Sequence, residues 1–111
     1  MEVLDITDPN NPIHTGSIQA SGSIPLYGAY SLVKNGNYLY VTSYTSDSLT
    51  VIDVSTPTNP TYSASIINNA GTRLDGPRGI EFDGSHVYIT SFDDDALQVI
   101  DVSTPTSPTA A

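Results

Sequence analysis

The sequence predicts an all-β chain assembled from a repeated unit of four short strands. Three observations support this prediction: a segment recurs at a fixed spacing, turn-forming residues interrupt the chain at short intervals, and no stretch shows the periodicity of a long helix. A length of 111 residues suits one small domain. Residues 1–111 are therefore expected to form a single segment.

The repeat is clearest around three aspartates. Asp5, Asp53 and Asp101 lie 48 residues apart, within the sequences MEVLDITDPNNP, LTVIDVSTPTNP and LQVIDVSTPTSP. The spacing holds through the intervening chain, where the segment Tyr40-Val41-Thr42-Ser43 matches Tyr88-Ile89-Thr90-Ser91. The chain thus divides into a partial unit at residues 1–12 and full units at residues 13–60 and 61–108.

Within each unit, runs rich in Tyr, Val, Ile and Thr predict four strands separated by turns. The predicted first strands span residues 29–34 and 77–82, the second strands 37–44 and 85–92, the third strands 1–6, 49–54 and 97–102, and the fourth strands 13–19 and 62–67. After the first strands, Asn35-Gly36 and Asp83-Gly84 predict type I′ hairpins, because both residues of each dipeptide accept positive φ. After the third strands, paired prolines end the strand because proline lacks an N–H donor.

Four-stranded units repeating at about 40 to 50 residues are typical of the blades of a β-propeller. Val51, Ile52 and Val54 place apolar side chains on both sides of one strand, which indicates a sheet covered on both faces. An open solenoid is the alternative. The predicted fold is a partial β-propeller of four-stranded antiparallel sheets, with about two blades plus a stub.

The segments LTVIDVSTP at residues 49–57 and LQVIDVSTP at residues 97–105 resemble the LVIVD repeat, and residues 40–43 resemble the core of the related YVTN repeat. The resemblance covers essentially the whole chain. It implies a prokaryotic, extracellular or cell-surface β-propeller, generally without known catalytic activity. It leaves the ligand open, because one propeller scaffold hosts many unrelated roles.

The predicted strand order is third and fourth, then first to fourth, then first to third. Propellers need about four to eight blades. The sequence therefore predicts either that the remaining repeats belong to a longer chain or that copies associate into a ring or a filament. In the second case, the strand at residues 13–19 of one chain completes the blade begun by residues 77–104 of another, and one third strand per junction is in surplus.

Composition excludes several partners. Twelve acidic residues against three basic ones give a net charge of −9, without a basic stripe for phosphates, so nucleic acid and anionic membranes are not expected partners. No apolar run is long enough to span a bilayer, and the first residues lack the charged-then-apolar layout of a signal peptide. The absence of cysteine excludes disulfides and thiolate metal sites. Export would need a signal outside this chain.

The expected binding face holds the loops that join fourth to first strands and second to third strands. The candidate ligand- or partner-binding residues there are Tyr27, Tyr30, Arg73, Arg78, Asp93, Asp94 and Asp95. Carboxylates of the Asp93-Asp94-Asp95 run are the type of ligand that Ca²⁺ prefers. A solvated loop is the favoured reading, because the run lacks the EF-hand pattern; pairing with Arg73 or Arg78 is a further possibility.

Other polar residues have structural explanations. Asp5, Asp53 and Asp101 recur in every unit, so we expect them to accept hydrogen bonds from backbone amides of their own turns. His14 and His86 lack zinc-ligand spacing and are expected at the surface or half-buried. Tyr40 and Tyr88 occupy equivalent strand positions and are expected in the core. No catalytic residues and no cofactor are predicted.

The functional hypothesis is a non-enzymatic interaction and assembly module of an exported, surface-associated repeat protein, with itself, other surface proteins or glycans as partners. The alternative is a carbohydrate- or calcium-binding propeller that uses the loop face. An enzyme is not expected, because no nucleophile elbow or phosphate-binding loop is present. A metal in a central channel would need a ring of ligands, whereas Glu81 has Val33 as its counterpart.

Overall fold

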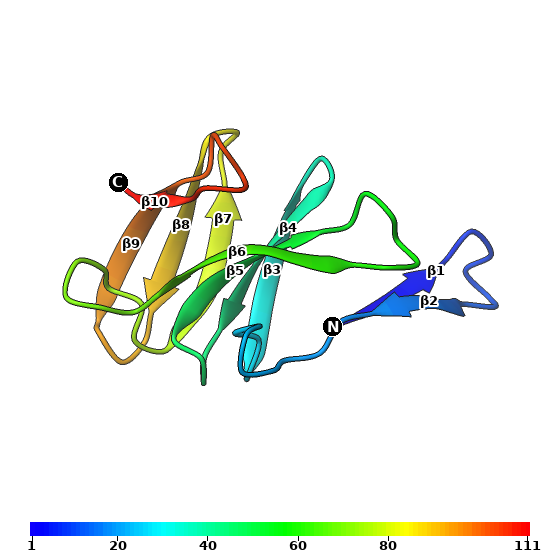
Figure 1. The fold of residues 1–111 in the computed structure, drawn as a ribbon, viewed down its shortest axis with the longest axis horizontal. Helices are drawn as coiled ribbons and strands as arrows, with labels where there is room; N and C mark the ends of the chain where they lie inside the picture. The colour runs from blue at the N-terminus through cyan, green and yellow to red at the C-terminus, as the bar shows by residue number, and fades with distance from the viewer.

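The computed structural model describes residues 1–111 and contains only strands, turns and loops (Figure 1). The strands are β1 (Glu2–Asp5), β2 (Ile13–Ser17), β3 (Ala29–Asn35), β4 (Tyr38–Ser43), β5 (Ser48–Asp53), β6 (Thr61–Ile67), β7 (Pro77–Phe82), β8 (His86–Ser91), β9 (Ala96–Asp101) and β10 (Thr109–Ala110). No helix with the length and apolar character of a membrane span is present. The molecule is elongated and measures 44 × 26 × 25 Å.

Three antiparallel sheets follow one another along the chain (Figure 1). β1 and β2 form a hairpin at the N-terminal end. β3, β4, β5 and β6 form a four-stranded sheet in that order, which we call the first blade, and β7, β8, β9 and β10 form the second blade. Neighbours in sequence are neighbours in each sheet. This confirms the all-β prediction and is consistent with partial β-propeller blades.

The hairpin turns lie one residue later than predicted. Asn35 still pairs with Tyr38, so Gly36 and Asn37 are the central residues of the first turn. Only Gly36 has positive φ in that turn, at 57°, and Gly84 repeats the pattern in the second blade with a φ of 112°. Glycine at the first central position is typical of a type II′ turn. The predicted type I′ turn is therefore wrong, because the strand before it continues through the asparagine.

The second blade contains a fourth strand that the sequence analysis did not predict. In β10, Thr109 pairs with Asp101 and Ala110 pairs with Ile100. The strand is only two residues long. The last unit therefore has all four strands, but the fourth pairs with only part of β9.

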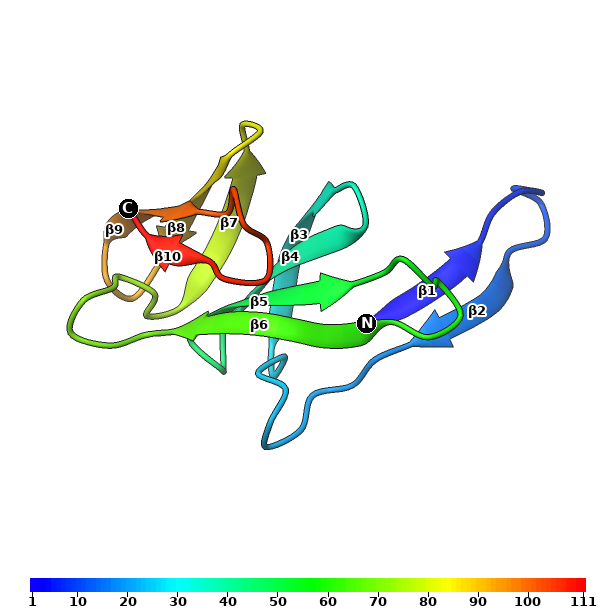
Figure 2. The ribbon, with the colours of Figure 1, turned by 45° about the horizontal axis from the view of Figure 1, so that its top comes forward.

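A hydrophobic core joins the two blades. The first blade contributes Tyr40, Leu49 and Val51, whose side chains are fully buried. The second blade and the loop before it contribute Leu74, Ile80, Val87, Ile89, Ile100 and Val102. The first strands of the two blades, β3 and β7, lie side by side (Figure 2). Blade packing rather than sheet pairing therefore holds the two repeats together.

A smaller cluster covers the opposite face of the first blade. Val41 and Ile52 pack there against Ile18 and Leu26, which belong to the segment between β2 and β3. Because successive side chains of a strand point to opposite faces, Tyr40 enters one cluster and Val41 the other. At its middle strands, β4 and β5, the first blade is thus covered on both faces, as its apolar pattern predicts.

Candidate functional site

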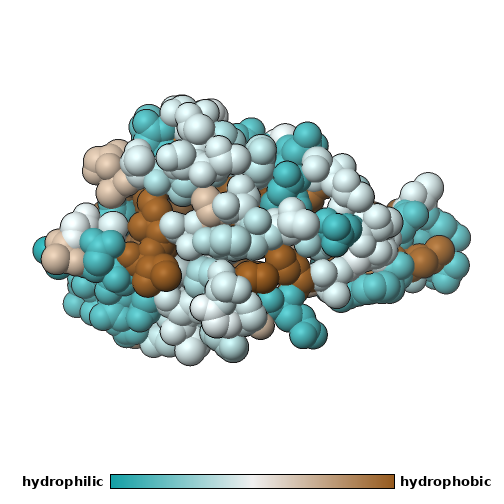
Figure 3. Space-filling model, in the orientation of Figure 1, coloured by the Kyte–Doolittle hydropathy of each residue, from teal (hydrophilic) through white to brown (hydrophobic).

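The second blade leaves one of its faces uncovered. Tyr88 and Thr90 of β8 lie opposite Val99 and Leu97 of β9, on the face that points away from the first blade. Leu97 is 60% exposed and Tyr88 is 36% exposed. We call these four residues the open face. Figure 3 shows that apolar surface is distributed in separate places along the molecule, with a large area beside the C-terminal sheet.

The corresponding face of the first blade is fully covered. The 48-residue spacing relates Leu97 to Leu49 and Tyr88 to Tyr40, and both residues of the first blade are 0% exposed. The prediction that Tyr40 and Tyr88 are both core residues is therefore wrong for Tyr88. No second sheet lies against its face, so the same residue type remains at the surface.

Arg78 lies at the junction of the blades, among aromatic rings. Its guanidinium carbon is 4.1 Å from the ring centre of Phe92, 5.0 Å from that of Tyr44 and 5.6 Å from that of Tyr30. Tyr30 and Phe92 are about as exposed as Leu97, at 62% and 60%. The structure thus brings Tyr30 and Arg78 together by cation–π contacts between the two blades. The further possibility of an ion pair between Arg73 or Arg78 and the aspartate run is not realised in the structure, where the only ion pairs involve histidines.

Four carboxylates gather beside this aromatic cluster. Asp47 accepts a hydrogen bond from the Gly76 amide at 3.0 Å, and Asp94 accepts one from the Asp75 amide at 3.1 Å. Desolvation raises the pKa of Asp75, and the neighbouring charges of Asp47, Asp93 and Asp94 raise it further. Gly76 has a φ of 61°, and a Cβ there would lie 2.5 Å from an Asp93 oxygen. The loop carboxylates therefore brace the chain where it enters the second blade.

The aspartate run does not act as one unit. Asp94 holds the Asp75 amide, Asp93 lies against Gly76 and raises the pKa of the nearby Tyr44 hydroxyl, and Asp95 is exposed with a φ of 50°. No three acidic or histidine side chains are arranged to hold a metal ion. The calcium site stays a prediction from sequence.

The other candidates on the loop face lie apart from this cluster. Tyr27 is 53% exposed, and its amide donates a hydrogen bond to Ser46 Oγ at 3.0 Å. Arg73 is exposed, and only its backbone is anchored: its amide donates to Gln98 Oε1 at 2.7 Å, and its carbonyl accepts from Ser91 Oγ at 2.6 Å. Only Arg78 makes cation–π contacts with the rings at this junction.

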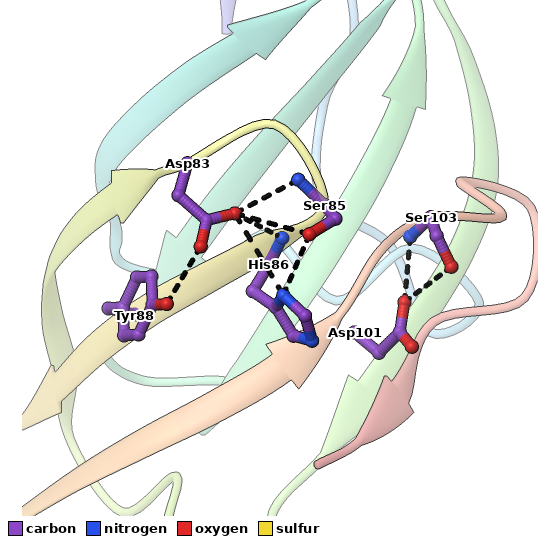
Figure 4. Close-up of polar contacts among 6 residues, drawn as sticks. All are labelled: Asp83, Ser85, His86, Tyr88, Asp101 and Ser103. Atoms are coloured by element: carbon purple, nitrogen blue, oxygen red, sulfur yellow. Dashed lines mark hydrogen bonds and ion pairs between the residues drawn. The ribbon is translucent and has the colours of Figure 1, made fainter.

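The recurrent aspartates have the structural role that the sequence predicts. Asp101 accepts hydrogen bonds from the Ser103 amide at 2.8 Å and the Ser103 hydroxyl at 2.6 Å (Figure 4). Asp53 accepts from the Ser55 amide at 2.8 Å, and Asp5 accepts from Thr7 in the same way. These bonds lower the pKa of all three carboxyls. Each aspartate therefore holds the turn that ends its own strand.

A fourth aspartate, Asp83, was not singled out by sequence as a hydrogen-bonded group. It accepts from the amides of Ser85 at 2.9 Å and His86 at 2.8 Å, and from the Tyr88 hydroxyl at 2.7 Å (Figure 4). These donors lower the pKa of Asp83 to about 2. The aspartate in the Asp-Gly turn signal was the available clue. Its counterpart Asn35 instead donates to the Tyr40 hydroxyl at 3.2 Å.

The histidines are peripheral, as predicted. His14 is exposed on β2 and pairs with Glu2 of β1. His86 is half-buried and lies 3.9 Å from Asp83, with its Nδ1 at 2.9 Å from the Ser85 hydroxyl. The two imidazoles lie on different sheets.

An apolar groove between β1 and β3 was missed by sequence reasoning. Its lining includes Met1, Leu4, Leu32, Leu39, Val41 and Val54. Leu4 and Leu32 are 50% and 47% exposed. In the first blade, the third strand β5 pairs with β4 on one side and with β6 on the other. Its counterpart β1 pairs only with β2. The groove therefore lies where the repeat would place first and second strands against β1.

The comparisons with known proteins agree with the repeat. A family model described as the LVIVD repeat matches residues 23–67 and 78–111, well over half of the chain. The first match contains β3 to β6, and the second contains nearly all of β7 and the rest of the second blade. No curated protein matches the sequence.

Proposed function

Because the chain belongs to the LVIVD-repeat family, whose repeat is structural, we propose that it is a non-enzymatic assembly module that self-associates through its blades. The open face of the second blade is the surface that receives a further blade. The partner is a second copy of the chain, which presents the groove between β1 and β3 together with the first blade. The contact is head to tail, so repeated association gives a ring or a filament.

One observation carries this proposal: equivalent residues differ in burial because only one blade has a neighbour on that side. Leu49 is 0% exposed where the second blade covers it, and Leu97 is 60% exposed at the equivalent position. The covering surface in the chain is another blade of the same repeat. The chain therefore contains its own example of the contact that we propose.

Polar groups support the same contact. Thr42 of the first blade donates its hydroxyl to the Arg78 carbonyl of the second blade at 2.7 Å. Its equivalent, Thr90, is exposed on the open face. The 48-residue spacing that relates Thr90 to Thr42 also relates Arg78 to Tyr30. In the proposed contact, Thr90 therefore donates to the Tyr30 carbonyl of a second copy. The proposed junction thus has a polar contact as well as apolar burial, which limits the partner to a blade in one orientation.

Light scattering on the purified chain tests the proposal. We expect the full chain to have a mass above that of the 11.7 kDa monomer, rising with concentration if filaments form. Leu97→Asp places a charge in the proposed contact and should return the mass to that of a monomer. A monomeric wild-type chain at every concentration would refute self-association.

An exposed residue away from the open face provides the control. Ile67, at the end of β6, is 52% exposed. Ile67→Asp adds the same charge to a different sheet and should leave the mass unchanged. Circular dichroism and a melting curve on both variants separate loss of association from loss of folding. If both substitutions reduce the mass equally, the added charge acts through general solubility and not through the open face.

A second candidate function is ligand binding at the loop face, favoured by the exposed rings of Tyr30 and Phe92 beside Arg78. Aromatic rings of this kind can stack on a carbohydrate. The nearby carboxylates of the aspartate run would be the groups that bind calcium. Both ligands suit the extracellular or cell-surface location that the family resemblance and composition favour. Titration with calcium and with a panel of oligosaccharides, read by melting temperature, distinguishes this function because a bound ligand stabilises the folded chain.

A further inference from the structure

β1 and β9 are two copies of the same third strand, and they differ in how firmly they are held. The repeat aligns Met1–Ile6 with Leu97–Val102. In β9, Ile100 is 0% exposed and the strand pairs with β8 from Ala96 to Asp101. In β1, Leu4 is 50% exposed and the following Ile6 is 68% exposed. β1 is therefore the copy that can leave its place at lower cost.

The contacts that hold β1 are few. It pairs with β2 alone, from Glu2 to Asp5, and the register shifts between Val3 and Leu4. Beyond the strand, Met1 and Ile18 exchange two hydrogen bonds of 2.9 and 3.0 Å. In Figures 1 and 2 the β1–β2 hairpin projects from the end of the molecule opposite the second blade. Among residues 1–6, only Met1 packs against the smaller apolar cluster that contains Ile18 and Val41.

The outer edge of β9 has room for a longer partner. In the first blade, β6 pairs with β5 along its whole length, from Ser48 to Asp53. In the second blade, β10 pairs only with Ile100 and Asp101. The Ala111 amide adds one bond to the Val99 carbonyl, at 3.0 Å. Residues 96–98 of β9 therefore have no partner strand on their outer side, and an unpaired edge favours strand addition.

We propose that β2 exchanges partners on assembly: β9 of a second copy replaces β1 beside β2, and β1 is released. This inference rests on the proposed self-association and adds which strands join the copies. β2 then serves as the fourth strand of the second copy's second blade. The exchange requires two short strand pairings to open, that of β1 with β2 and that of β10 with β9.

The repeat determines the register of the new pairing. Within the first blade, Ser48 lies opposite Ile67 and Leu49 lies opposite Ile66. The repeat spacing of 48 residues relates Ile67 to Gln19 and Ser48 to Ala96. The new pairing therefore places Ala96 of the second copy opposite Gln19. Leu97 of the second copy comes opposite Ile18, in the place that Met1 occupies in the single chain.

The exchange also accounts for both unfilled apolar surfaces. When β9 of the second copy stands in the place of β1, its neighbours β8 and β7 enter the groove beside β3. Leu32 and Leu39 of the groove become covered by that sheet, and the open face of the second copy meets the first blade. β1 therefore acts as an internal competitor that occupies β2 until a second copy displaces it.

Disulfide trapping tests the register, because the natural chain has no cysteine. Gln19 is exposed and Ala96 is half-buried, so both positions accept cysteine with little damage. A Gln19→Cys variant is mixed with an affinity-tagged Ala96→Cys variant under mild oxidation. We expect a disulfide between the two variants, seen as a mixed dimer on a non-reducing gel. The control mixes Gln19→Cys with Ser107→Cys, an exposed position beyond the other end of β9.

Removal of the competitor tests the release of β1. A variant without residues 2–6 should associate about tenfold more tightly than the full chain, because no strand has to be displaced from β2. An unchanged or weaker affinity of the folded variant would overturn the role of β1. If the shortened chain fails to fold, the cysteine experiment on full-length chains decides.

The outcomes separate this inference from the function on which it rests. If the wild-type chain associates and the mixed Gln19–Ala96 disulfide is no more abundant than the control, the exchange is wrong and self-association stands. If the wild-type chain does not associate, both are wrong. A dominant Gln19–Ala96 product together with tighter association of the shortened chain supports the exchange.

Discussion

The second and third strands of the two blades have similar sequences and different surroundings. In the first blade, Leu49 and Tyr40 are fully buried on one face, while Val41 and Ile52 are covered on the other. In the second blade only the face toward the first blade is covered, and Leu97 remains 60% exposed. The comparison shows that burial in a repeat protein belongs to the junction between units and not to the unit itself.

The largest expected difference between the blades comes from truncating one leucine in each. Leu49→Ala should lower the free energy of unfolding by about 2–5 kcal/mol, because it removes buried methyl groups and leaves a cavity. Leu97→Ala should cost about 1 kcal/mol or less in the dilute monomer, because most of its side chain is already in water. Urea unfolding of both variants at low concentration measures the difference.

Concentration sharpens the same comparison. If a second copy covers the open face, the effect of Leu97→Ala should grow as the protein is concentrated, while the effect of Leu49→Ala stays constant. Equal costs for the two variants in the monomer would contradict the burial difference between the blades.

A smaller effect is expected at the junction between the blades. Arg78→Ala removes the cation–π contacts to Tyr30 and Tyr44 of the first blade and to Phe92 of the second, and should lower the free energy of unfolding by about 1–2 kcal/mol. Arg73→Ala is the control, because its side chain is exposed, and should change stability by no more than about 0.5 kcal/mol.

Charge and packing at this junction can be separated. Arg78→Met keeps an apolar stem against the rings and removes the positive charge, so it should recover part of the stability that Arg78→Ala loses. Full recovery would mean that packing alone accounts for the contact. Thermal or urea unfolding of the three variants under identical salt conditions provides the measurement.

The smallest effect concerns the turns, where Asp83 of the second blade replaces Asn35 of the first. The hydrogen bonds to Asp83 lower its pKa from 3.8 to about 2 in the folded chain. This carboxylate therefore stabilises the fold above about pH 4, and its contribution is lost as the pH falls through about 2. Asp83→Asn should make stability fall less steeply over that interval, as measured by urea unfolding at a series of pH values.

One donor can be removed to test the cause of the shift. Tyr88→Phe deletes the hydroxyl that donates to Asp83 at 2.7 Å and leaves both backbone donors in place. The pKa of Asp83 should then rise part of the way toward its ordinary value, as followed by an NMR titration of its carboxyl group. An unchanged titration would show that the backbone amides alone hold the carboxylate.

Much of the fold was predictable because its signals are local. The third strand at residues 49–54 and the fourth at residues 62–67 lie within one residue of β5 and β6. The role of Asp101 also followed from its place before a serine and a proline turn. The turn at Gly36 was misplaced by one residue, because a sequence signal does not report how far the strand ladder continues beyond it.

The candidate site was less predictable because it joins separated segments. Tyr30 and Arg78 were both chosen from one loop face, but their contact depends on β3 and β7 lying side by side. The possible pairing of an arginine with the aspartate run is not found, and the Arg78 guanidinium lies over aromatic rings instead. The groove at Leu32 had no sequence signal, because an apolar residue in a strand does not show whether another sheet covers it.

The sequence by itself determined the period, the order of the strands and the residues that end them, because alternation, proline and glycine act over a few neighbouring positions. Only the tertiary structure decided which copy of each residue is buried. Leu49 and Leu97 have similar local sequences, SLTVIDV and ALQVIDV, and their difference in burial arises from a second sheet that covers one and not the other. Hydrophobic burial is a property of two surfaces in contact, and one strand encodes only its own side.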